Sequence, residues 1–202
     1  MIAALVLAAG ASTRMGQPKA ALPLGSGGRT VLSASVVTLL DAGLPSVVVV
    51  AGAHAGAVRA AWPSRDPRVR IIDHAGWAQG QLSSLVAGLD AVDDPRLEAI
   101  LVTLVDVPLV TSATVRAVVA AWRKTRAPIV RPVDGPLHGH PVIFDRSVFV
   151  ELRAADPAVG AKAVFAAHLA EILDVPVSDA GAFQDLDTPE DYRRVLKGSE
   201  RL

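Results

Sequence analysis

A loop of small residues carries the first side chains that could do chemistry. Residues 5–24 read LVLAAGASTRMGQPKAALPL, so an apolar run gives way to a loop bounded by Gly10 and Gly16. Arg14 lies in this loop and Lys19 follows it. Because the loop has no bulky side chain before Arg14, its backbone N–H groups could approach an anion closely. The pattern is neither a Walker A loop nor GxGxxG. The residues favour phosphate binding over a plain turn with two surface cations.

Carboxylates at two other places could complement these cations. Asp106 closes the apolar stretch AILVTLVDVPLV, and Thr111 is better placed than Asp106 to cap the next helix. Metal binding and capping both remain open for Asp106 at this point. In DLDTPEDY, an N-cap at Thr188 explains the TPED residues but leaves Asp185 and Asp187 unexplained. Either of these could supply a second carboxylate to magnesium, which prefers hard oxygen ligands and often takes its remaining ligands from phosphates and water.

Two further segments carry polar residues with a simple structural interpretation. The stretch GWAQGQLSSLVAGL, residues 76–89, places Gly80, Ser83 and Ser84 before a predicted helix, where a serine N-cap is the simplest interpretation. His138 and His140 lack a third metal ligand nearby and are interpreted as hydrogen-bonding loop residues. No serine lies in a nucleophile elbow, so the sequence gives little support to a hydrolase.

The apolar pattern predicts the elements that must position these groups. Strand-like runs cover 2–7, 46–51, 69–72, 99–104, 128–131, 141–144 and 171–175, and helix patterns cover 30–42, 54–61, 83–91, 112–125, 146–153, 160–168 and 188–197. Such alternation is typical of βαβ units. The short strands around GPLHGHP predict an antiparallel hairpin within a mixed, mostly parallel sheet. We therefore expect a three-layer α/β/α fold forming a single domain over residues 1–202.

The predicted sheet would bring the loop and one carboxylate together. Ligands of such sheets bind beyond the carboxyl ends of the strands, close to the point where strand order reverses. The small-residue loop follows strand 2–7, and Asp106 follows strand 99–104. If these strands are neighbours, a cationic loop faces a carboxylate across a crevice. That arrangement suits a nucleotide with a divalent metal.

Composition excludes several classes of protein. The chain has 202 residues with 20 basic and 20 acidic side chains, so nothing indicates a general nucleic-acid binder. It has no cysteine, which excludes disulfides and thiol catalysis. No run reaches the roughly 18–20 apolar residues that a membrane span needs. The apolar start lacks the basic segment of a signal peptide. We expect a soluble, cytoplasmic protein with no membrane or nucleic-acid partner.

The motifs, taken together, resemble those of the MobA-like nucleotidyltransferases. The segments that carry the resemblance are LAAGASTRMGQPKAALPL, GWAQGQLSSLVAGL, VDVPLV, GHPVIF, VGAKAVF and DLDTPEDY, in this order over nearly the whole chain. The molybdopterin cytidylyltransferase branch is the most similar. Three departures, at Val105, Val107 and Lys162, fall where the surroundings of the acceptor or the metal would be built; Lys162 replaces an arginine of the family pattern.

The resemblance implies a Rossmann-like nucleotidyltransferase fold and transfer of a nucleoside monophosphate from a nucleoside triphosphate to a phosphorylated acceptor. Carried over by position, Arg14 and Lys19 would be the catalytic cations, and Asp106 with Asp187 would hold Mg²⁺, the implied cofactor. The nucleotide would be bound by residues of the loop and of the segment before the third helix: Leu7, Ala8, Ala9, Gly10, Ser12, Thr13, Gly16, Gly80, Leu82, Ser83 and Ser84.

Simple phosphate chemistry explains why so few residues suffice to catalyse the transfer that the resemblance implies. The second pKa of a phosphate monoester is near 6, so the acceptor is already largely a dianion at neutral pH and needs no general base. The protein must supply in-line positioning and neutralise the charge that grows on the leaving pyrophosphate.

The same resemblance indicates the substrates. The form LAAG favours cytosine within the family, whereas guanylyltransferases usually show LAGG, and a methyl group at Ala9 would narrow the base pocket. We therefore expect CTP and molybdopterin as substrates, with a molybdenum hydroxylase or its chaperone as a partner. The alternatives are a molybdenum cofactor guanylyltransferase, a methylerythritol-phosphate cytidylyltransferase-like enzyme, and a non-catalytic chaperone for the nucleotide or cofactor.

Overall fold

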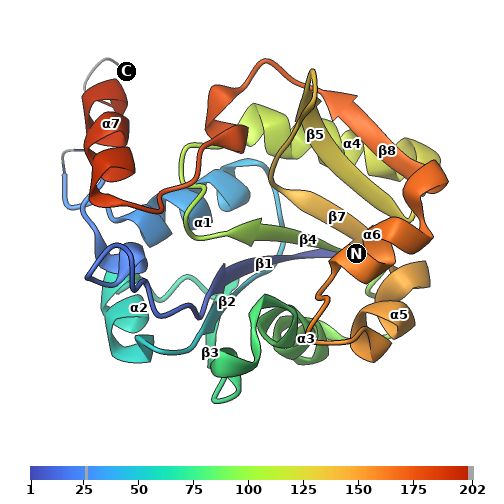
Figure 1. The fold of residues 1–202 in the computed structure, drawn as a ribbon, viewed down its shortest axis with the longest axis horizontal. Coiled ribbons are helices and arrows are strands. Elements are labelled where there is room, and N and C mark those ends of the chain that lie inside the picture. The colour runs from blue at the N-terminus through green and yellow to red at the C-terminus, as the bar shows by residue number, and fades with distance from the viewer. Residues whose placement is uncertain (26, 200–202) are drawn as a thin grey trace.

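A central β-sheet with helices on both faces organises the molecule (Figure 1). The computed structural model describes residues 1–25 and 27–199. The strands are β1 (Ile2–Ala8), β2 (Val47–Ala51), β3 (Val69–Asp73), β4 (Ala99–Leu104), β5 (Ile129–Asp134), β6 (Leu137–His138), β7 (Val142–Asp145) and β8 (Ile172–Pro176). The helices are α1 (Val31–Asp41), α2 (Ala55–Ala61), α3 (Gln81–Val92), α4 (Ser112–Thr125), α5 (Phe149–Ala154), α6 (Lys162–Ala167) and α7 (Pro189–Ser199).

The sheet is mixed and mostly parallel, as the sequence predicts. Its strand order is β3-β2-β1-β4-β7-β5-β6, and β8 pairs with β5 in parallel. Strands β1 to β4 run parallel to one another, whereas β7 lies antiparallel between β4 and β5. The predicted hairpin is confirmed, since β5 and β7, the strands on either side of GPLHGHP, pair antiparallel; the short β6 lies in the connection and also pairs with β5. Strands β1 and β4 are neighbours, so the loop after β1 and Asp106 after β4 lie at the same edge of the sheet, as the predicted crevice requires.

Alternate residues of β1 face two separate apolar clusters, and this explains why the strand is apolar throughout. Ala4 and Val6 pack with side chains of α1, α2 and α4. Ala3 and Leu5 pack on the other side, with side chains of α3, α5 and α6. All seven residues of β1 are buried. The strand is thereby fixed on both faces, and the loop at its carboxyl end leaves from a rigid point.

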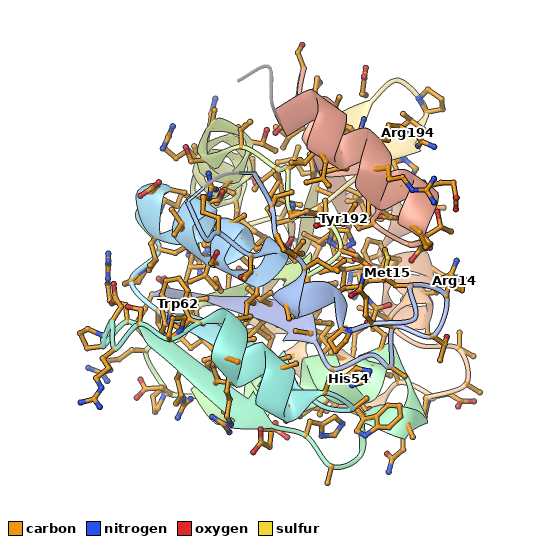
Figure 2. The ribbon with its side chains drawn as sticks, turned by 90° about the vertical axis from the view of Figure 1, so that its left-hand side faces the viewer. Arg14, Met15, His54, Trp62, Tyr192 and Arg194 are labelled. Carbon is orange, nitrogen blue, oxygen red and sulfur yellow. The ribbon has the colours of Figure 1, made fainter. Side chains whose placement is uncertain are left out.

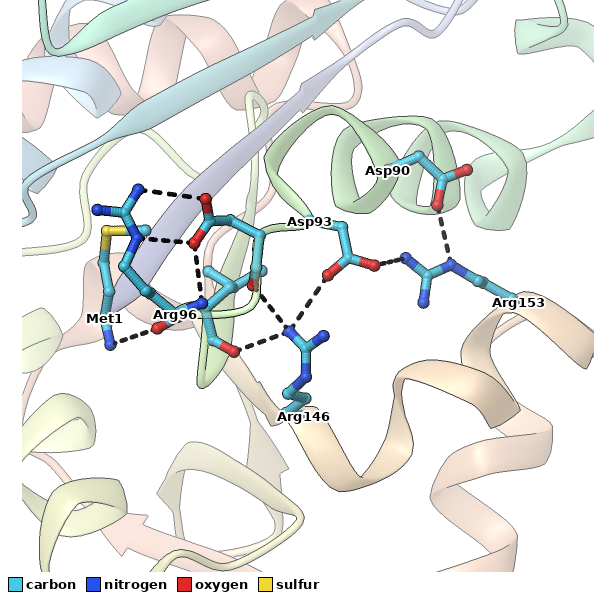
Figure 3. A network of polar contacts seen from close by, with 8 residues as sticks. Met1, Asp90, Asp93, Arg96, Arg146 and Arg153 are labelled. Atoms are coloured by element: carbon cyan, nitrogen blue, oxygen red, sulfur yellow. Dashed lines mark hydrogen bonds and ion pairs between the residues drawn. The ribbon is translucent and has the colours of Figure 1, made fainter.

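A network of arginine contacts joins the end of α3 to α5 (Figure 3). Arg146, just before α5, donates to Asp93 and to the carbonyl oxygens of residues 94 and 97. Arg153 of α5 donates to Asp90 and Asp93. Because α3 and the chain that follows α5 both line a cavity described below, this network fixes the spacing of its walls.

Three predicted helices differ from the structure at their starts by two or more residues, and one of them, predicted over 160–168, becomes α-helical at Lys162. The predicted helix 83–91 begins at Gln81, because Gly80 adopts a φ of 103° and turns the chain into the helix without any serine cap. The predicted helix 146–153 begins with a 3-10 turn over 146–148, capped by Asp145, and becomes α-helical at Phe149. Residues 26 and 200–202 of the predicted single domain lie outside the described residues. No described helix is both long and apolar enough to cross a membrane.

Candidate active site

The loop after β1 is a tight, anchored turn. Ser12 and Gly16 both have positive φ, 51° and 73°, and the carbonyl of Ser12 accepts from the N–H of Met15 at 3.0 Å. Met15 is only 5% exposed and packs in the core beneath the loop, whereas Arg14 lies at its outer edge (Figure 2). The Ser12 hydroxyl accepts from the backbone N–H of Lys19 at 3.2 Å. The loop therefore holds Lys19 at a fixed place.

Lys19 lies between two carboxylates. Its Nζ is 2.7 Å from Oδ1 of Asp187 and 3.2 Å from Oδ2 of Asp106. Arg14 completes the cluster, with Nη1 at 2.9 Å from the other oxygen of Asp187. The Lys19 side chain is 12% exposed and that of Arg14 is 69% exposed. Lys19 is thus the partly desolvated cation of the pair, and its charge acts more strongly on neighbours than one in open water.

Backbone contacts bring Asp187 beside Asp106. The N–H of Leu186 donates to the carbonyl of Asp106 at 2.7 Å, so residues 185–187 run along the end of β4. Upstream, Asp179 accepts from the N–H and hydroxyl of Thr111 at the start of α4. The hydrogen bond from Lys19 holds the pKa of Asp187 below its usual value, and the charge of Arg14 adds to this effect. Asp187 is consequently a carboxylate at neutral pH.

Asp185 differs from Asp187 in its surroundings. Within the part of the chain that the structure describes, its carboxyl group makes no hydrogen bond or ion pair with another residue. Partial burial raises the pKa of Asp185, and the negative charge of Asp106 raises it further. Asp185 therefore lies near the cluster without belonging to its hydrogen-bonded core.

A cavity of about 390 Å³ opens over the loop and the cluster. Most of the residues predicted to bind nucleotide or to act in catalysis line it. These are Leu7, Ala8, Ala9, Gly10, Ser12, Thr13, Arg14, Lys19, Gly80, Ser84 and Asp106. They come from the carboxyl ends of β1 and β4 and from the start of α3, so the structure does bring these distant segments together.

Four predicted site residues lie elsewhere. Gly16 does not line the cavity, and its positive φ closes the turn of the loop. Leu82 lines a second cavity on the other side of the start of α3. The hydroxyl of Ser83 donates to the carbonyl of Gly80 at 2.8 Å and lies 3.0 Å from Nε2 of His74, so it braces the segment before α3. Asp187 does not line the cavity itself, but it forms ion pairs with Lys19 and Arg14, which do.

The structure adds wall residues that the sequence interpretation missed. His54, which contacts the carbonyl of Ala11 at 2.9 Å through Nε2, lines the cavity, as do Trp77 and Gln81. His54 follows β2, the parallel neighbour of β1, so its place at a strand's carboxyl end was the available signal. Trp77 packs against Gly52, where any Cβ would lie 2.7 Å from Cβ of Trp77 and 2.8 Å from that of Ala9. A glycine is required there to let these two walls approach.

The donor set fits a hard divalent cation. Oδ1 of Asp106 is buried and has no hydrogen-bond partner among the described residues. No group of three or more histidines and carboxylates suited to a metal occurs among those residues. The chain would therefore contribute two carboxylates at most. This matches magnesium, which is held by one or two carboxylates and takes its other ligands from phosphates and water.

Comparison with known proteins places this geometry in a family. Residues 4–172 match the model of the MobA-like NTP transferase domain. The chain is 32% identical to nicotine blue oxidoreductase of Paenarthrobacter nicotinovorans, over 96% of both chains. It is 25% identical to the molybdenum cofactor cytidylyltransferase of Escherichia coli (strain K12), over 93% of this chain and 92% of that one.

Solved structures agree with this placement. Rv0371c from Mycobacterium tuberculosis H37Rv superposes with a TM-score of 0.80 at 33% identity, covering 98% of both chains. A structure of Rv0371C in complex with manganese has a TM-score of 0.75 at 32% identity, covering 97% of this chain and 98% of that one. The chain is therefore a nucleotidyltransferase that belongs to the MobA-like NTP transferase family.

Proposed function

We propose that the protein is a magnesium-dependent CTP:molybdopterin cytidylyltransferase that makes molybdopterin cytosine dinucleotide and pyrophosphate. The observation that carries the proposal is the Asp106–Lys19–Asp187 cluster beside a cavity walled by the backbone of residues 7–14. Cations next to backbone N–H groups suit a triphosphate, and paired carboxylates suit its metal. The E. coli relative carries the matching name.

The chain's own groups can perform each part of the transfer. An oxygen of the acceptor phosphate attacks the α-phosphorus, and the bond from that phosphorus to the bridging oxygen of the β-phosphate breaks. Lys19 and Arg14 offset the charge that develops on the departing pyrophosphate. Asp106 and Asp187 would hold the magnesium ion, which supplies further charge neutralisation on the phosphates. The acceptor needs no base because its phosphate is largely dianionic at neutral pH.

The preference for cytosine rests on Ala9. Ala9 is 4% exposed and lines the cavity together with Trp77, and the form LAAG goes with cytosine in the family that the chain resembles. A methyl group there favours a pyrimidine over the larger purine. The test offers CTP and GTP separately with molybdopterin and identifies the dinucleotide by mass. A clear preference for GTP would make the protein a guanylyltransferase, and failure with every nucleotide would overturn the proposal.

The assignment of the metal ligands has its own test. Asp106→Asn and Asp187→Asn should each weaken Mn²⁺ binding measured by electron paramagnetic resonance in the presence of CTP, because each removes a carboxylate oxygen from the ion. Asp185→Asn is the matched variant, and it should bind Mn²⁺ nearly as the unchanged protein does. Equal loss in all three variants would contradict the choice of Asp187 over Asp185.

Assays of the same purified protein distinguish three other functions from this one. A methylerythritol-phosphate cytidylyltransferase would use CTP with that sugar phosphate in place of molybdopterin. A non-catalytic chaperone for delivery to a molybdenum hydroxylase would bind CTP and release no pyrophosphate. A reductase, suggested by the name of the Paenarthrobacter relative, would oxidise a nicotinamide cofactor without consuming CTP. The carboxylate–lysine cluster favours transfer over reduction and sequestration, which do not require it, and the acceptor assay separates the two cytidylyltransferases.

A further inference from the structure

The turn between β2 and α2 is hydrogen-bonded to the loop after β1. The N–H of Ala53 donates to the carbonyl of Ala9 at 3.0 Å, and Nε2 of His54 lies 2.9 Å from the carbonyl oxygen of Ala11. A carbonyl oxygen only accepts hydrogen bonds, so Nε2 of His54 carries the hydrogen of this contact. In Figure 2 the His54 side chain lies beside the loop that carries Arg14. One short turn therefore holds two carbonyl groups of the loop.

The side chain of His54 contacts the loop and does not cap its own helix. His54 occupies the position before the first residue of α2, where serine, threonine, aspartate and asparagine are preferred because their side chains accept from the N–H groups of the first turn. Among the described residues, the His54 side chain makes no such capping hydrogen bond. Departures from local preferences are expected at functional sites. This departure points to the loop, the group that His54 contacts instead.

The loop has four consecutive backbone N–H groups that other parts of the described chain do not use. The N–H groups of residues 11–14 donate to no residue that the structure describes, and all four residues line the cavity over the loop. Ser12, in the middle of this run, has a φ of 51°. Successive N–H groups next to such a left-handed residue form a concave set of donors that suits an anion.

The contact from His54 fixes the orientation of one peptide group in this run. The carbonyl of Ala11 and the N–H of Ser12 belong to the same planar trans peptide, so they point in opposite directions. Because His54 holds the carbonyl on its own side, the N–H of Ser12 is held on the other side. If this peptide turned over, it would place an electronegative carbonyl oxygen among the donors of the loop, where it would repel a phosphate.

We propose that His54 is a positioning residue for the triphosphate. Its Nε2–H holds the peptide between Ala11 and Ser12 so that the loop presents N–H donors, and no carbonyl oxygen, to the phosphate groups. The inference rests on the proposed nucleotidyl transfer, in which this loop binds the phosphates of the nucleotide. His54 acts through the backbone of the loop, so it affects the binding of the phosphates and not the choice of base.

Two amide variants test this role by the reach of their side chains. The amide nitrogen of His54→Gln extends about as far from the backbone as Nε2 of histidine, whereas that of His54→Asn ends one carbon shorter. We expect His54→Asn to raise the Kd for CTP about three- to tenfold, since one hydrogen bond is lost. His54→Gln should bind CTP nearly as the unchanged protein does. Calorimetry with Mg²⁺ and without any acceptor measures the Kd values.

Two controls show that the effect belongs to the loop. His168→Asn changes a histidine that lines neither cavity and contacts Glu151 and Glu171, and it should leave the Kd for CTP unchanged. The melting temperatures of His54→Asn and His54→Gln should agree, so that a difference in Kd between them does not reflect a difference in folding.

Inorganic tripolyphosphate keeps the inference separate from the proposed function. It carries a chain of phosphates without a base, so its binding reports the loop alone. Binding of tripolyphosphate should likewise be weakened in His54→Asn and kept in His54→Gln, and the ratio of the Kd values for CTP and GTP should not change. If no acceptor is turned over while this pattern is seen, the proposed function fails and the role of His54 stands.

Four results would overturn the role of His54. They are equal binding of CTP by the two amide variants, a loss confined to His54→Gln, a changed ratio between CTP and GTP in His54→Asn, and a loss with CTP that tripolyphosphate does not reproduce. The last result includes failure of the unchanged protein to bind tripolyphosphate, because the loop would then not be a phosphate site.

Discussion

At the scale of single residues, the position of Lys19 decides what the site can do. Its ammonium group contacts Asp106 and Asp187 and is 12% exposed, so it joins the two carboxylates across the crevice. Arg14 contacts only Asp187 and is 69% exposed. Because water screens an exposed charge, the two cations should contribute unequally to stabilising developing negative charge.

Lys19→Ala should lower kcat for pyrophosphate release by about 10²–10³, since one preorganised charge contact to the developing anion is lost. Arg14→Ala should lower it less. Steady-state assays with CTP and molybdopterin provide the measurement. Lys124→Ala, an exposed residue of α4, serves as the control and should retain full activity. A loss in Arg14→Ala equal to that in Lys19→Ala would contradict the argument from exposure.

At the scale of elements, the segment 179–188 holds the carboxylates in place. Asp179 accepts a hydrogen bond from Thr111 and so attaches the segment to the start of α4. The segment also passes so close to Leu109 that a Cβ at Gly181 would overlap the carbonyl oxygen of Leu109. Overlap with a backbone atom cannot be relieved by turning a side chain. The position of Asp187 therefore depends on a glycine six residues away.

Gly181→Ala should destabilise the protein by about 1–3 kcal/mol, the usual cost of forcing an extra methyl group into a packed site, and it should reduce activity. Gly56→Ala is the matched substitution, because its Cβ meets nothing within 4 Å in α2. It should stabilise the protein by about 0.4–1 kcal/mol. Urea unfolding measures both free energies. Full activity and unchanged stability in Gly181→Ala would show that the segment can move aside.

A titrating contact links α5 to the chain after α6. His168 contacts Glu151 through Nε2 at 2.9 Å and Glu171 through Nδ1 at 3.0 Å, and the hydrogen bond with Glu151 is the main reason that the pKa of His168 is raised. A raised pKa in the folded state stabilises the protein fully below the unfolded pKa of about 6.5, and that stabilisation is lost as the pH rises through the folded pKa.

Between pH 6 and pH 8 the free energy of unfolding should therefore fall more in the unchanged protein than in His168→Gln. The difference should stay below about 1 kcal/mol, because both glutamates are largely exposed and water screens the pair. Chemical denaturation at several pH values measures it. Parallel pH profiles for the two proteins would contradict a stabilising role for this contact.

The elements also show which features of the fold could be predicted from the sequence. The strands other than the two-residue β6, the hairpin over 129–144 and the cap at Thr111 follow from local patterns and agree with the structure. The start of α3 does not, because Gly80 ends the preceding turn through its own backbone conformation and leaves Ser83 inside the helix. The contacts of Lys19 join residues 87 and 168 positions apart, so no local pattern could have established them. The predicted neighbouring strands pointed to Asp106 in advance, and the family resemblance selected Asp187 rather than Asp185.

At the scale of the whole molecule, the site draws on both halves of the sheet. The cavity over the loop lies at the parallel strands and the second cavity at the antiparallel ones, while Leu7 and Gln81 border both. The arginine network at the end of α3 and α5 connects the walls of the second cavity (Figure 3). Ligands bound in either cavity should therefore stabilise the whole fold against unfolding.

CTP with Mn²⁺, at about 100 times its dissociation constant, should stabilise the folded state by about 2.7 kcal/mol. For a chain of this length that corresponds to a rise in Tm of roughly 5–10 °C. Differential scanning fluorimetry measures the shift. Lys19→Ala should show a smaller shift at the same concentrations, and Lys124→Ala the full one. An identical shift in Lys19→Ala would mean that this lysine does not contact the nucleotide.

The pairing of Arg14 and Lys19 with Asp106 and Asp187 has a consequence for the speed of encounter. Two positive and two negative charges offset one another at the mouth of the cavity, and the chain as a whole has a formal net charge of zero. Such a site projects little electric field into the solvent, so it cannot draw in a charged ligand from a distance. Arrival of the nucleotide should be governed by diffusion and fit, and its association rate should vary little with ionic strength.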